Sequence, residues 1–272
     1  MPTTLAVPTD NCPLTNRGPS TSEIWQPTAG TSWQIVLQSA ITTSSSTADV
    51  SVYDIDLFDN TKATINALHS QDRKVICYFS AGTYEDWRDD AADFQERDLG
   101  SPLDEWEGER WVDLSSERIR AIMTARLDLA VEKGCDGVDP DNVDAYDNEQ
   151  GGIGMTEENT IDFVNWLADE AHNRGLAIGL KNAGAVISSV IGNMQWSVNE
   201  ECADYNECDV YRVFLDEDKP VFHIEYPKGE EVNDKVDVGE AERKAVCEGY
   251  DEAARFSTLI KNMDLDVWWQ DC

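Results

Sequence analysis

The chain has 272 residues, of which 41% are hydrophobic, and a formal net charge of −33 from 54 acidic and 21 basic residues. This length suffices for one large hydrophobic core, and no apolar run approaches the length of a membrane span. The excess of acid excludes ordinary nucleic-acid binding, because phosphate would be repelled, and is typical of a hydrated surface or of a protein with a cationic partner.

Residues 1–30 hold five prolines among small polar residues, a composition that predicts a tail rather than a core. We therefore place the folded domain at residues 31–272. No signal peptide is present, but the Thr/Pro/Ser-rich start after Met1 resembles a chain from which a secretion signal has been removed. We expect a secreted monomer.

Three strand-like runs begin the domain, namely WQIVLQ at 33–38, VSVYDIDLF at 50–58 and KVICYFS at 74–80. The second run alternates apolar and polar residues and carries Asp54 near its end, and the third is typical of a buried parallel strand. Asn60 can cap a helix between them.

A long loop at 82–110 separates the third run from RWVDL at 110–114. The loop holds Trp87, Arg88 and Trp106, which are more aromatic and charged side chains than a connection requires. Long loops in compact domains are usually functional or disordered, and the aromatic residues favour a functional loop. RWVDL predicts a further strand that ends near Asp113, and the helix after it ends at Gly134.

The stretch CDGVDPD at 135–141 predicts a strand whose last residues are acidic. Asp139 and Asp141 lie at alternate positions, and Pro140 cannot donate to a sheet ladder, so the strand should end about there. In an α/β barrel this end of the strands carries the site. The acids here do not match the ligand and glycine positions of a calcium loop, while a solvated acidic turn is the plainer alternative.

Alternating helix and strand patterns continue to the C-terminus. The further strand-like runs are LAIGLKN at 176–182, WSVNEE at 196–201, VFHIEY at 221–226 and FSTLIKNM at 256–263. Helices are predicted from Thr156 to Gly175, through Val186 to Ile191, and near 239–255.

This alternation predicts a parallel sheet with helical crossovers, closed as a single (β/α)8 TIM barrel. Nine strand-like runs compete for eight places, so we treat WQIVLQ as an added N-terminal strand. The run at 50–58 then counts as strand one. On that count Asp139 and Asp141 end strand four, and Glu200 ends strand six.

The seven cysteines lack the spacing of a zinc site and the three histidines are far apart, so we expect no metal and no cofactor. Cys202 with Cys208, and Cys247 with Cys272, are plausible disulfides in an oxidising compartment. Cys77 lies inside a strand and is predicted to be a buried thiol. The odd count leaves at least one cysteine unpaired.

Polar side chains collect at successive strand ends and would line one cleft, namely Asp54, Tyr78, Asp113, Asp139, Asp141, Lys181, Asn182, Glu200, Glu201, Glu225 and Tyr226. Two carboxylates on non-adjacent strands, with aromatic residues that stack on sugar, are what cleavage of a glycosidic bond requires. One acid protonates the leaving oxygen while the other attacks the anomeric carbon or activates water. For Asp54, Asp113 and Glu225, a structural role as a hydrogen-bonded core carboxylate is at least as plausible.

The ordered series of motifs resembles glycoside hydrolase family 114, the endo-α-1,4-polygalactosaminidases. The motifs are VYDIDLFD, KVICYFSAG, Trp87-Arg88, RWVDL, CDGVDPDNVD, GLKNA, NEEC followed by YNEC, and HIEYP, and the resemblance covers roughly residues 31–265. It implies a (β/α)8 barrel that cuts partly deacetylated α-1,4-linked galactosamine polymer within the chain. Such a polymer is a cationic partner, which offers a second cause for the acidity.

The resemblance also implies the catalytic pair, an aspartate after the fourth strand and a glutamate after the sixth. We predict Asp141 as nucleophile and Glu200 as general acid/base. The Asp141-Asn142 dipeptide resembles the one at the nucleophile of retaining α-galactosidases, which favours Asp141 over Asp139. The substrate-binding residues that we predict are Asp54, Tyr78, Asp113, Asp139, Lys181, Asn182, Glu225 and Tyr226.

Three expectations follow for Asp141 and Glu200, two about their geometry and one about the pKa of Glu200. Glu201 is the rival acid, but it should point away from the side that Glu200 faces if the strand alternates regularly. A retaining pair should lie about 5 to 5.5 Å apart and an inverting pair roughly 6.5 to 9.5 Å. Glu200 would need a raised pKa to arrive protonated.

Two other classes of protein stay open. A barrel that binds amino-sugar polymer without cutting it would keep the aromatic residues and most acids, and Asp141→Asn would leave its function unchanged. A metal-dependent barrel lyase or phosphodiesterase would hold Mg2+ with three or four acids and would lose activity to a chelator. Neither explains an aspartate and a glutamate at the ends of strands four and six.

Overall fold

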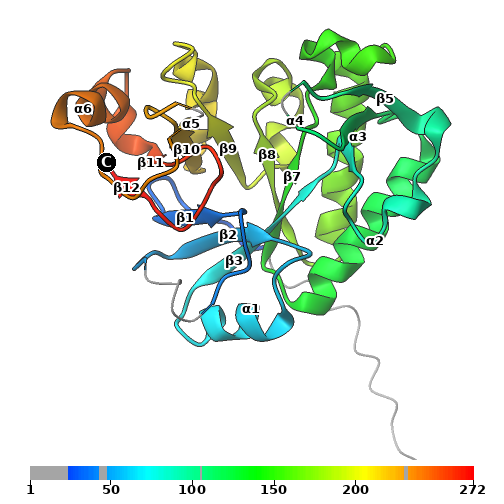
Figure 1. The fold of residues 1–272 in the computed structure, drawn as a ribbon, viewed down its shortest axis with the longest axis horizontal. Helices are drawn as coiled ribbons and strands as arrows, with labels where there is room; N and C mark the ends of the chain where they lie inside the picture. The colour runs from blue at the N-terminus through cyan, green and yellow to red at the C-terminus, as the bar shows by residue number, and fades with distance from the viewer. Residues whose placement is uncertain (1–23, 43–47, 105, 230–231) are drawn as a thin grey trace, which may run out of the picture.

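The computed structural model describes residues 24–42, 48–104, 106–229 and 232–272, and a curved sheet occupies its centre (Figure 1). The strands of this sheet are β1 (Trp33–Val36), β2 (Val52–Asp56), β3 (Lys74–Ser80), β7 (Gly137–Asp141), β8 (Ala177–Lys181), β9 (Trp196–Glu200), β10 (Val221–Glu225), β11 (Ser257–Ile260) and β12 (Gln270–Asp271). They pair in that order, in parallel except for the antiparallel pair β11 and β12.

A second sheet of three antiparallel strands is inserted between β3 and the next long helix. It consists of β4 (Thr83–Glu85), β5 (Leu99–Pro102) and β6 (Glu109–Val112), in the order β4-β6-β5. The RWVDL run belongs to β6 and therefore lies outside the main sheet, contrary to its predicted place as a barrel strand. WQIVLQ instead supplies β1, which pairs with β2 within the main sheet, so its exclusion was also wrong.

Helices α1, α2 and α3 lie along the outer side of the sheet (Figure 1). The helices are α1 (Lys62–His69), α2 (Glu117–Lys133), α3 (Glu157–Asn173), α4 (Ile187–Val190), α5 (Arg212–Asp216) and α6 (Glu240–Glu248). The Ser116 hydroxyl caps α2, which ends at Gly134 in the left-handed conformation, and Thr156 with Asn159 forms a capping box on α3. The predicted end of α2 and start of α3 are thus confirmed.

Alternate residues of each strand face the inside of the curve, where apolar side chains form a core of their own. This inner core contains Trp33, Ile35, Val52, Ile76, Trp196, Phe222 and Ile224. A larger core lies between the outer face of the sheet and the helices. The indole of Trp196 fits inside only because its neighbours are glycines, since a Cβ at Gly179 would lie 2.0 Å from its Nε1 atom.

The two ends of the parallel sheet approach each other. No backbone ladder joins β1 to β11 among the described residues, so the arrangement is a curled parallel sheet. Side chains connect the two strands, because Trp33 Nε1 donates to the carbonyl of Ser257 at 2.7 Å and Lys261 Nζ donates to that of Ile35 at 2.8 Å. Within the described ranges, no helix is both long and apolar enough to span a membrane.

Residues 24–30, predicted as part of the tail, contact the folded domain. The Trp25 ring lies 5.5 Å from the Trp196 ring, and Gln26 Nε2 donates to the carbonyl of Gln195 at 2.7 Å. The folded part therefore includes these residues, and the rest of the predicted tail lies outside the described residues.

Disulfides join Cys202 with Cys208 and Cys247 with Cys272, which confirms both predicted pairs. Cys77 is not a free thiol as predicted, because it pairs with Cys135 across 58 residues of sequence. Cys77 lies in β3 and Cys135 just before β7, and the parallel pairing of these two strands brings the sulfurs together. The seventh cysteine, Cys12, lies outside the described residues.

Candidate active site

A cleft of about 1080 Å³ opens at the C-terminal ends of the strands. Tyr78, Asp141, Lys181 and Glu200, from β3, β7, β8 and β9, line its floor. The inserted sheet and the segment at 263–265 contribute to its walls. This is the end at which α/β barrels carry their active sites.

Depth along the strand separates the two aspartates of β7. Asp139 and Asp141 are two residues apart and so point to the same face of the strand, but Asp139 is fully buried while Asp141, at the end of the strand, lines the cleft. The strand continues through Pro140 instead of ending before it, because the β7–β8 ladder stops at Val138 and the strand is paired only with β3 beyond that point. A proline is tolerated where one side of a strand is unpaired.

The turn after Asp141 is fixed by close packing. Asn142 has a φ of 60°, and its backbone N–H donates to Asp141 Oδ1 at 2.7 Å. A Cβ at Gly82 would lie 1.5 Å from the Asn142 carbonyl oxygen, so only glycine lets the chain after β3 pass this turn.

Lys181 joins the two predicted catalytic carboxylates. Its Nζ atom lies 3.1 Å from Asp141 Oδ1 and 2.8 Å from Glu200 Oε2. These two oxygens are therefore at most about 6 Å apart, the sum of the two distances, so both carboxyl groups lie on one patch of the cleft floor. Burial disfavours the charge of Lys181, but Asp141, Glu200 and Asp139 outweigh it and raise the pKa of the lysine.

Neutral donors complete the shell around the pair. The Tyr78 hydroxyl donates to Asp141 Oδ2 at 2.9 Å, and the Tyr226 hydroxyl donates to Glu200 Oε1. Burial raises the pKa of both phenols, which keeps them protonated as donors. Asn182 accepts from the backbone N–H of Glu200 at 2.9 Å, which fixes the end of β9.

The electrostatics of Glu200 differ from the sequence-based expectation of a raised pKa. Burial acts to raise the pKa of Glu200, but Lys181, Tyr226 and Asn182 together outweigh burial, and the pKa is lowered. The protein without ligand therefore holds Glu200 as an ion-paired carboxylate.

Asp54 and Asp139 form a buried pair one layer below Asp141 and Glu200. Both are fully buried, and no other described residue donates a hydrogen bond to their four carboxyl oxygens. Burial, and then the facing charge of Asp139, raises the pKa of Asp54 well above its usual range, and burial raises that of Asp139 to about 7. The pair therefore holds a proton, and neither residue lines the cleft.

Two further predicted residues lie away from the cleft. Asp113 accepts hydrogen bonds from the backbone N–H and hydroxyl of Ser115, at the turn that leads to α2. Glu225 has the opposite strand parity to Tyr226, and its carboxylate accepts from Ala203 N and pairs with His223 at 2.7 Å each. Asp113 and Glu225 were predicted to bind substrate, but neither lines the cleft.

Glu201 is placed otherwise than predicted. Regular alternation would turn it away from Glu200, but the strand ends at Glu200 and Glu201 adopts a φ of 63°. Glu201 therefore lines the same cleft.

Several cleft residues escaped the sequence analysis as site residues. They are Asp56, Glu85, Trp111, Glu109, Asp144, Glu149 and Asp264. Trp87 and Trp106, in the loop predicted to be functional, also line the cleft and are 51% and 53% exposed. Exposed indole rings beside a carboxylate-rich floor are suited to stack on sugar rings. The length and aromatic content of the loop were the available signal for Glu85, Trp87, Trp106 and Glu109.

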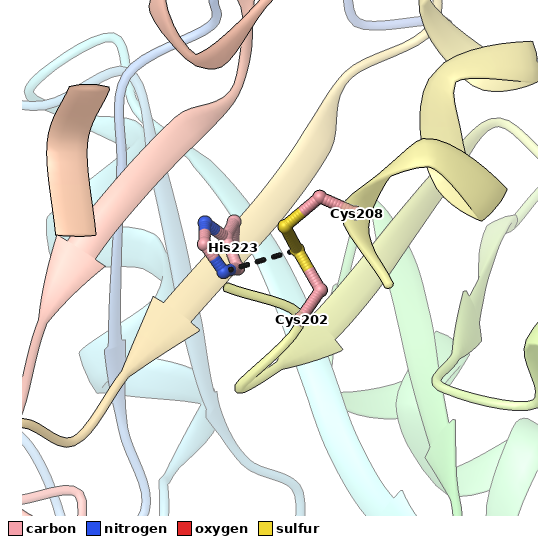
Figure 2. A group of neighbouring side chains, drawn as sticks. All are labelled: Cys202, Cys208 and His223. Atoms are coloured by element: carbon pink, nitrogen blue, oxygen red, sulfur yellow. Dashed lines mark hydrogen bonds between the residues drawn. A yellow bond between two sulfur atoms is a disulfide. The ribbon is translucent and has the colours of Figure 1, made fainter. Parts of the chain in front are cut away.

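One cluster has the composition of a metal site. Cys202, Cys208 and His223 present ligand atoms within 4.8 Å of one another, and Figure 2 shows the imidazole beside the two sulfurs. The sulfurs are joined as a disulfide, so they do not offer the thiolates that bind metal. His223 Nε2 lies 3.4 Å from Cys202 Sγ, so the cluster anchors the loop that follows Glu201.

Comparison with known proteins gives four findings. The sequence model of glycoside hydrolase family GH114 matches residues 15–272. The crystal structure of Aspergillus fumigatus Ega3 in complex with galactosamine is similar at 55% sequence identity and a TM-score of 0.89, over 91% of this chain and 97% of that chain. The glycoside hydrolase domain of PelA from Pseudomonas aeruginosa has 13% identity and a TM-score of 0.68, over 88% and 98% of the two chains, and supports the fold alone. The comparison with curated proteins found no match.

Proposed function

Because the chain belongs to glycoside hydrolase family GH114, we propose that it cleaves partly deacetylated α-1,4-linked galactosamine polymer at internal linkages of the polymer. Ega3, which is 55% identical, binds galactosamine in its crystal structure, and this supports the substrate class. The net charge of −33 would also attract a polycation at long range.

The observation that carries the mechanism is the contact of Lys181 with both Asp141 and Glu200. Asp141 attacks the anomeric carbon, the bond to the leaving oxygen breaks, and Glu200 gives a proton to that oxygen. Because the pKa of Glu200 is lowered, only the fraction of the protein in which Glu200 is protonated carries out this step. Glu200, now a carboxylate, then takes a proton from water as the water oxygen attacks the same carbon and releases Asp141.

We infer that configuration is retained. The bound of about 6 Å between the facing oxygens favours the short separation of retaining enzymes, about 5 to 5.5 Å, over the roughly 6.5 to 9.5 Å that leaves room for water in inverting enzymes.

Tyr78, Lys181, Asn182 and Tyr226 act in this proposal by fixing the two carboxylates. Each contacts Asp141 or Glu200 through a hydrogen bond or an ion pair. These four are the predicted substrate-binding residues that contact Asp141 or Glu200. In this proposal they orient the two carboxylates before the sugar binds.

We also propose that the curled sheet functions as a closed (β/α)8 barrel. Eight parallel strands are available, and hydrogen bonds from Trp33, Ser257 and Lys261 connect β1 with β11. Such closure would hold β7 and β9 at a fixed distance and so keep the catalytic pair in register.

Secretion is the third part of the proposal. Three disulfides are present among the described residues, and disulfides persist in oxidising compartments. A secreted enzyme would meet a polysaccharide that lies outside the cell.

The test is to incubate the protein with deacetylated and with N-acetylated α-1,4-galactosamine polymer and to weigh the products by mass spectrometry. We expect short oligomers from the deacetylated polymer, their loss in Asp141→Asn and in Glu200→Gln, and unchanged cleavage with a strong chelator. No oligomers from either polymer would overturn the assignment.

A further inference from the structure

Two carboxylates face each other directly in the inserted sheet. Glu85 on β4 is paired with Glu109 on the antiparallel strand β6. Glu85 is 3% exposed and Glu109 is 8% exposed, and both line the cleft. Like charges at such cross-strand positions destabilise a sheet, and burial increases the cost.

The two carboxylates are not compensated equally. Arg88 lies 2.8 Å from Glu85 Oε1, and Arg126 lies 3.7 Å from Glu85 Oε2. Glu109 has no basic side chain within ion-pair distance among the described residues, and it accepts a hydrogen bond from the neutral Thr83 hydroxyl at 2.8 Å. The cleft therefore contains one nearly buried carboxylate whose counter-charge is missing.

The position of Glu109 links it to the nucleophile. Its donor Thr83 hydrogen-bonds with Ser80, which accepts from the Asn142 side chain at 2.9 Å, next to Asp141. The charge of Asp141 also acts on Glu109 and, after burial and the neighbouring Glu85, contributes to raising the pKa of Glu109 to about 7. Glu109 and Asp141 thus line the same cleft, and a chain of hydrogen bonds links Glu109 to the residue next to Asp141.

We propose that the Glu109 carboxylate binds the ammonium group on C2 of the amino sugar whose anomeric carbon faces Asp141. This inference rests on the proposed function, because a 2-amino sugar carries its charge on the carbon next to the anomeric carbon that Asp141 attacks. The ammonium ion supplies the counter-charge that the inserted sheet lacks, and an N-acetyl group does not.

The variants that test this are Glu109→Gln and, as control, Glu107→Gln. Glutamine keeps the acceptor for Thr83 and removes only the charge, so the fold should persist, and removing the repulsion from Glu85 should raise the melting temperature. Glu107 lies two residues away, is exposed and does not line the cleft, so its variant makes the same charge change outside the site.

The first measurement is calorimetric binding of galactosamine and of galactose. Glu109→Gln should raise the dissociation constant for galactosamine about 10- to 100-fold, as for loss of a charge-assisted hydrogen bond, and leave that for galactose unchanged. At pH 6, below the Glu109 pKa of about 7, galactosamine should release a proton from wild type and from Glu107→Gln, but not from Glu109→Gln. A purely structural role would not alter proton release.

Kinetics on the polymers separate this inference from the function on which it rests. The inference predicts a higher KM for deacetylated polymer in Glu109→Gln, with a smaller change in kcat. If wild type cleaves the polymer and Glu109→Gln binds and cleaves equally well, the inference is wrong and the proposed function stands. If wild type cleaves neither polymer, the proposed function itself fails.

Discussion

The ammonium group of Lys181 lies 2.8 Å from Oε2 of Glu200, so the acid/base of the proposed mechanism is ion-paired in the protein without ligand. Lys181 is almost fully buried, so solvent screens this contact less than it would screen a pair at the surface. The lysine therefore controls the proton affinity of the group that must protonate the leaving oxygen.

Replacing Lys181 with methionine should move the pH dependence of cleavage. The pKa of Glu200 is lowered, so Glu200 keeps its proton only at acidic pH, and cleavage by wild type should fall as the pH rises above that range. Without the lysine charge the pKa of Glu200 rises, and the alkaline limb of kcat should shift to higher pH. The check is a pH series of kcat on deacetylated polymer.

The matched control for this experiment is Lys181→Arg, which retains a positive charge at the same position. Its alkaline limb should stay closer to that of wild type than the limb of Lys181→Met. Identical limbs in wild type and Lys181→Met would show that Lys181 does not set the pKa of Glu200.

The buried pair Asp54 and Asp139 should make stability fall with rising pH. Both pKa values are raised in the folded protein, to about 7 for Asp139, so the folded state binds protons more tightly than the unfolded chain. The stability from this pair is present below the unfolded pKa of about 3.9 and is lost as the pH rises through about 7.

Urea unfolding at pH 5 and pH 8 tests this expectation. The loss of free energy of unfolding between the two pH values should be smaller in Asp139→Asn than in wild type, whereas Asp169→Asn on the exposed face of α3 should match wild type. An equal loss in all three proteins would mean that the pair holds no proton at pH 5.

The disulfides should separate stability from activity. Closing 58 residues should stabilise by about 4 kcal/mol and closing 6 residues by about 2 kcal/mol, so Cys77→Ala/Cys135→Ala should be the less stable double variant. Cys202→Ala/Cys208→Ala should lose more kcat, by about 10-fold, because its loop directly follows the end of β9, which carries the proposed acid/base Glu200. Denaturant midpoints and kcat measured at the same temperature check both, and the reverse order in kcat would contradict this role for the loop.

The strand count shows how far sequence patterns carry the fold. Asp141 and Glu200 were placed on strands four and six, and the parallel strands of the sheet give the same numbers. The numbers agree although two runs before strand four were assigned wrongly. Leaving WQIVLQ out of the barrel lowered the count by one, and counting RWVDL as a barrel strand raised it by one. RWVDL does form a strand, and periodicity does not reveal which of two sheets a strand joins.

Features that depend on three-dimensional contact were less predictable. Strand alternation gives Asp139 and Asp141 the same face, so it could not show that Asp139 is buried below the cleft that Asp141 lines. Alternation also failed at Glu201, where the backbone leaves the extended conformation. Cys77 appeared to be a buried thiol because its partner lies 58 residues away. Lys181 looked like a substrate-binding residue, since only the fold shows that it contacts two carboxylates at once.

The most direct test of the central claim is the configuration of the first product. Proton NMR during the first minutes of cleavage reports whether the new reducing end is released as the α or the β anomer. Two carboxyl groups held on one lysine, with facing oxygens within about 6 Å, predict the α anomer, the configuration of the bond that was cut. Initial release of the β anomer would contradict a nucleophilic role for Asp141 beside Glu200.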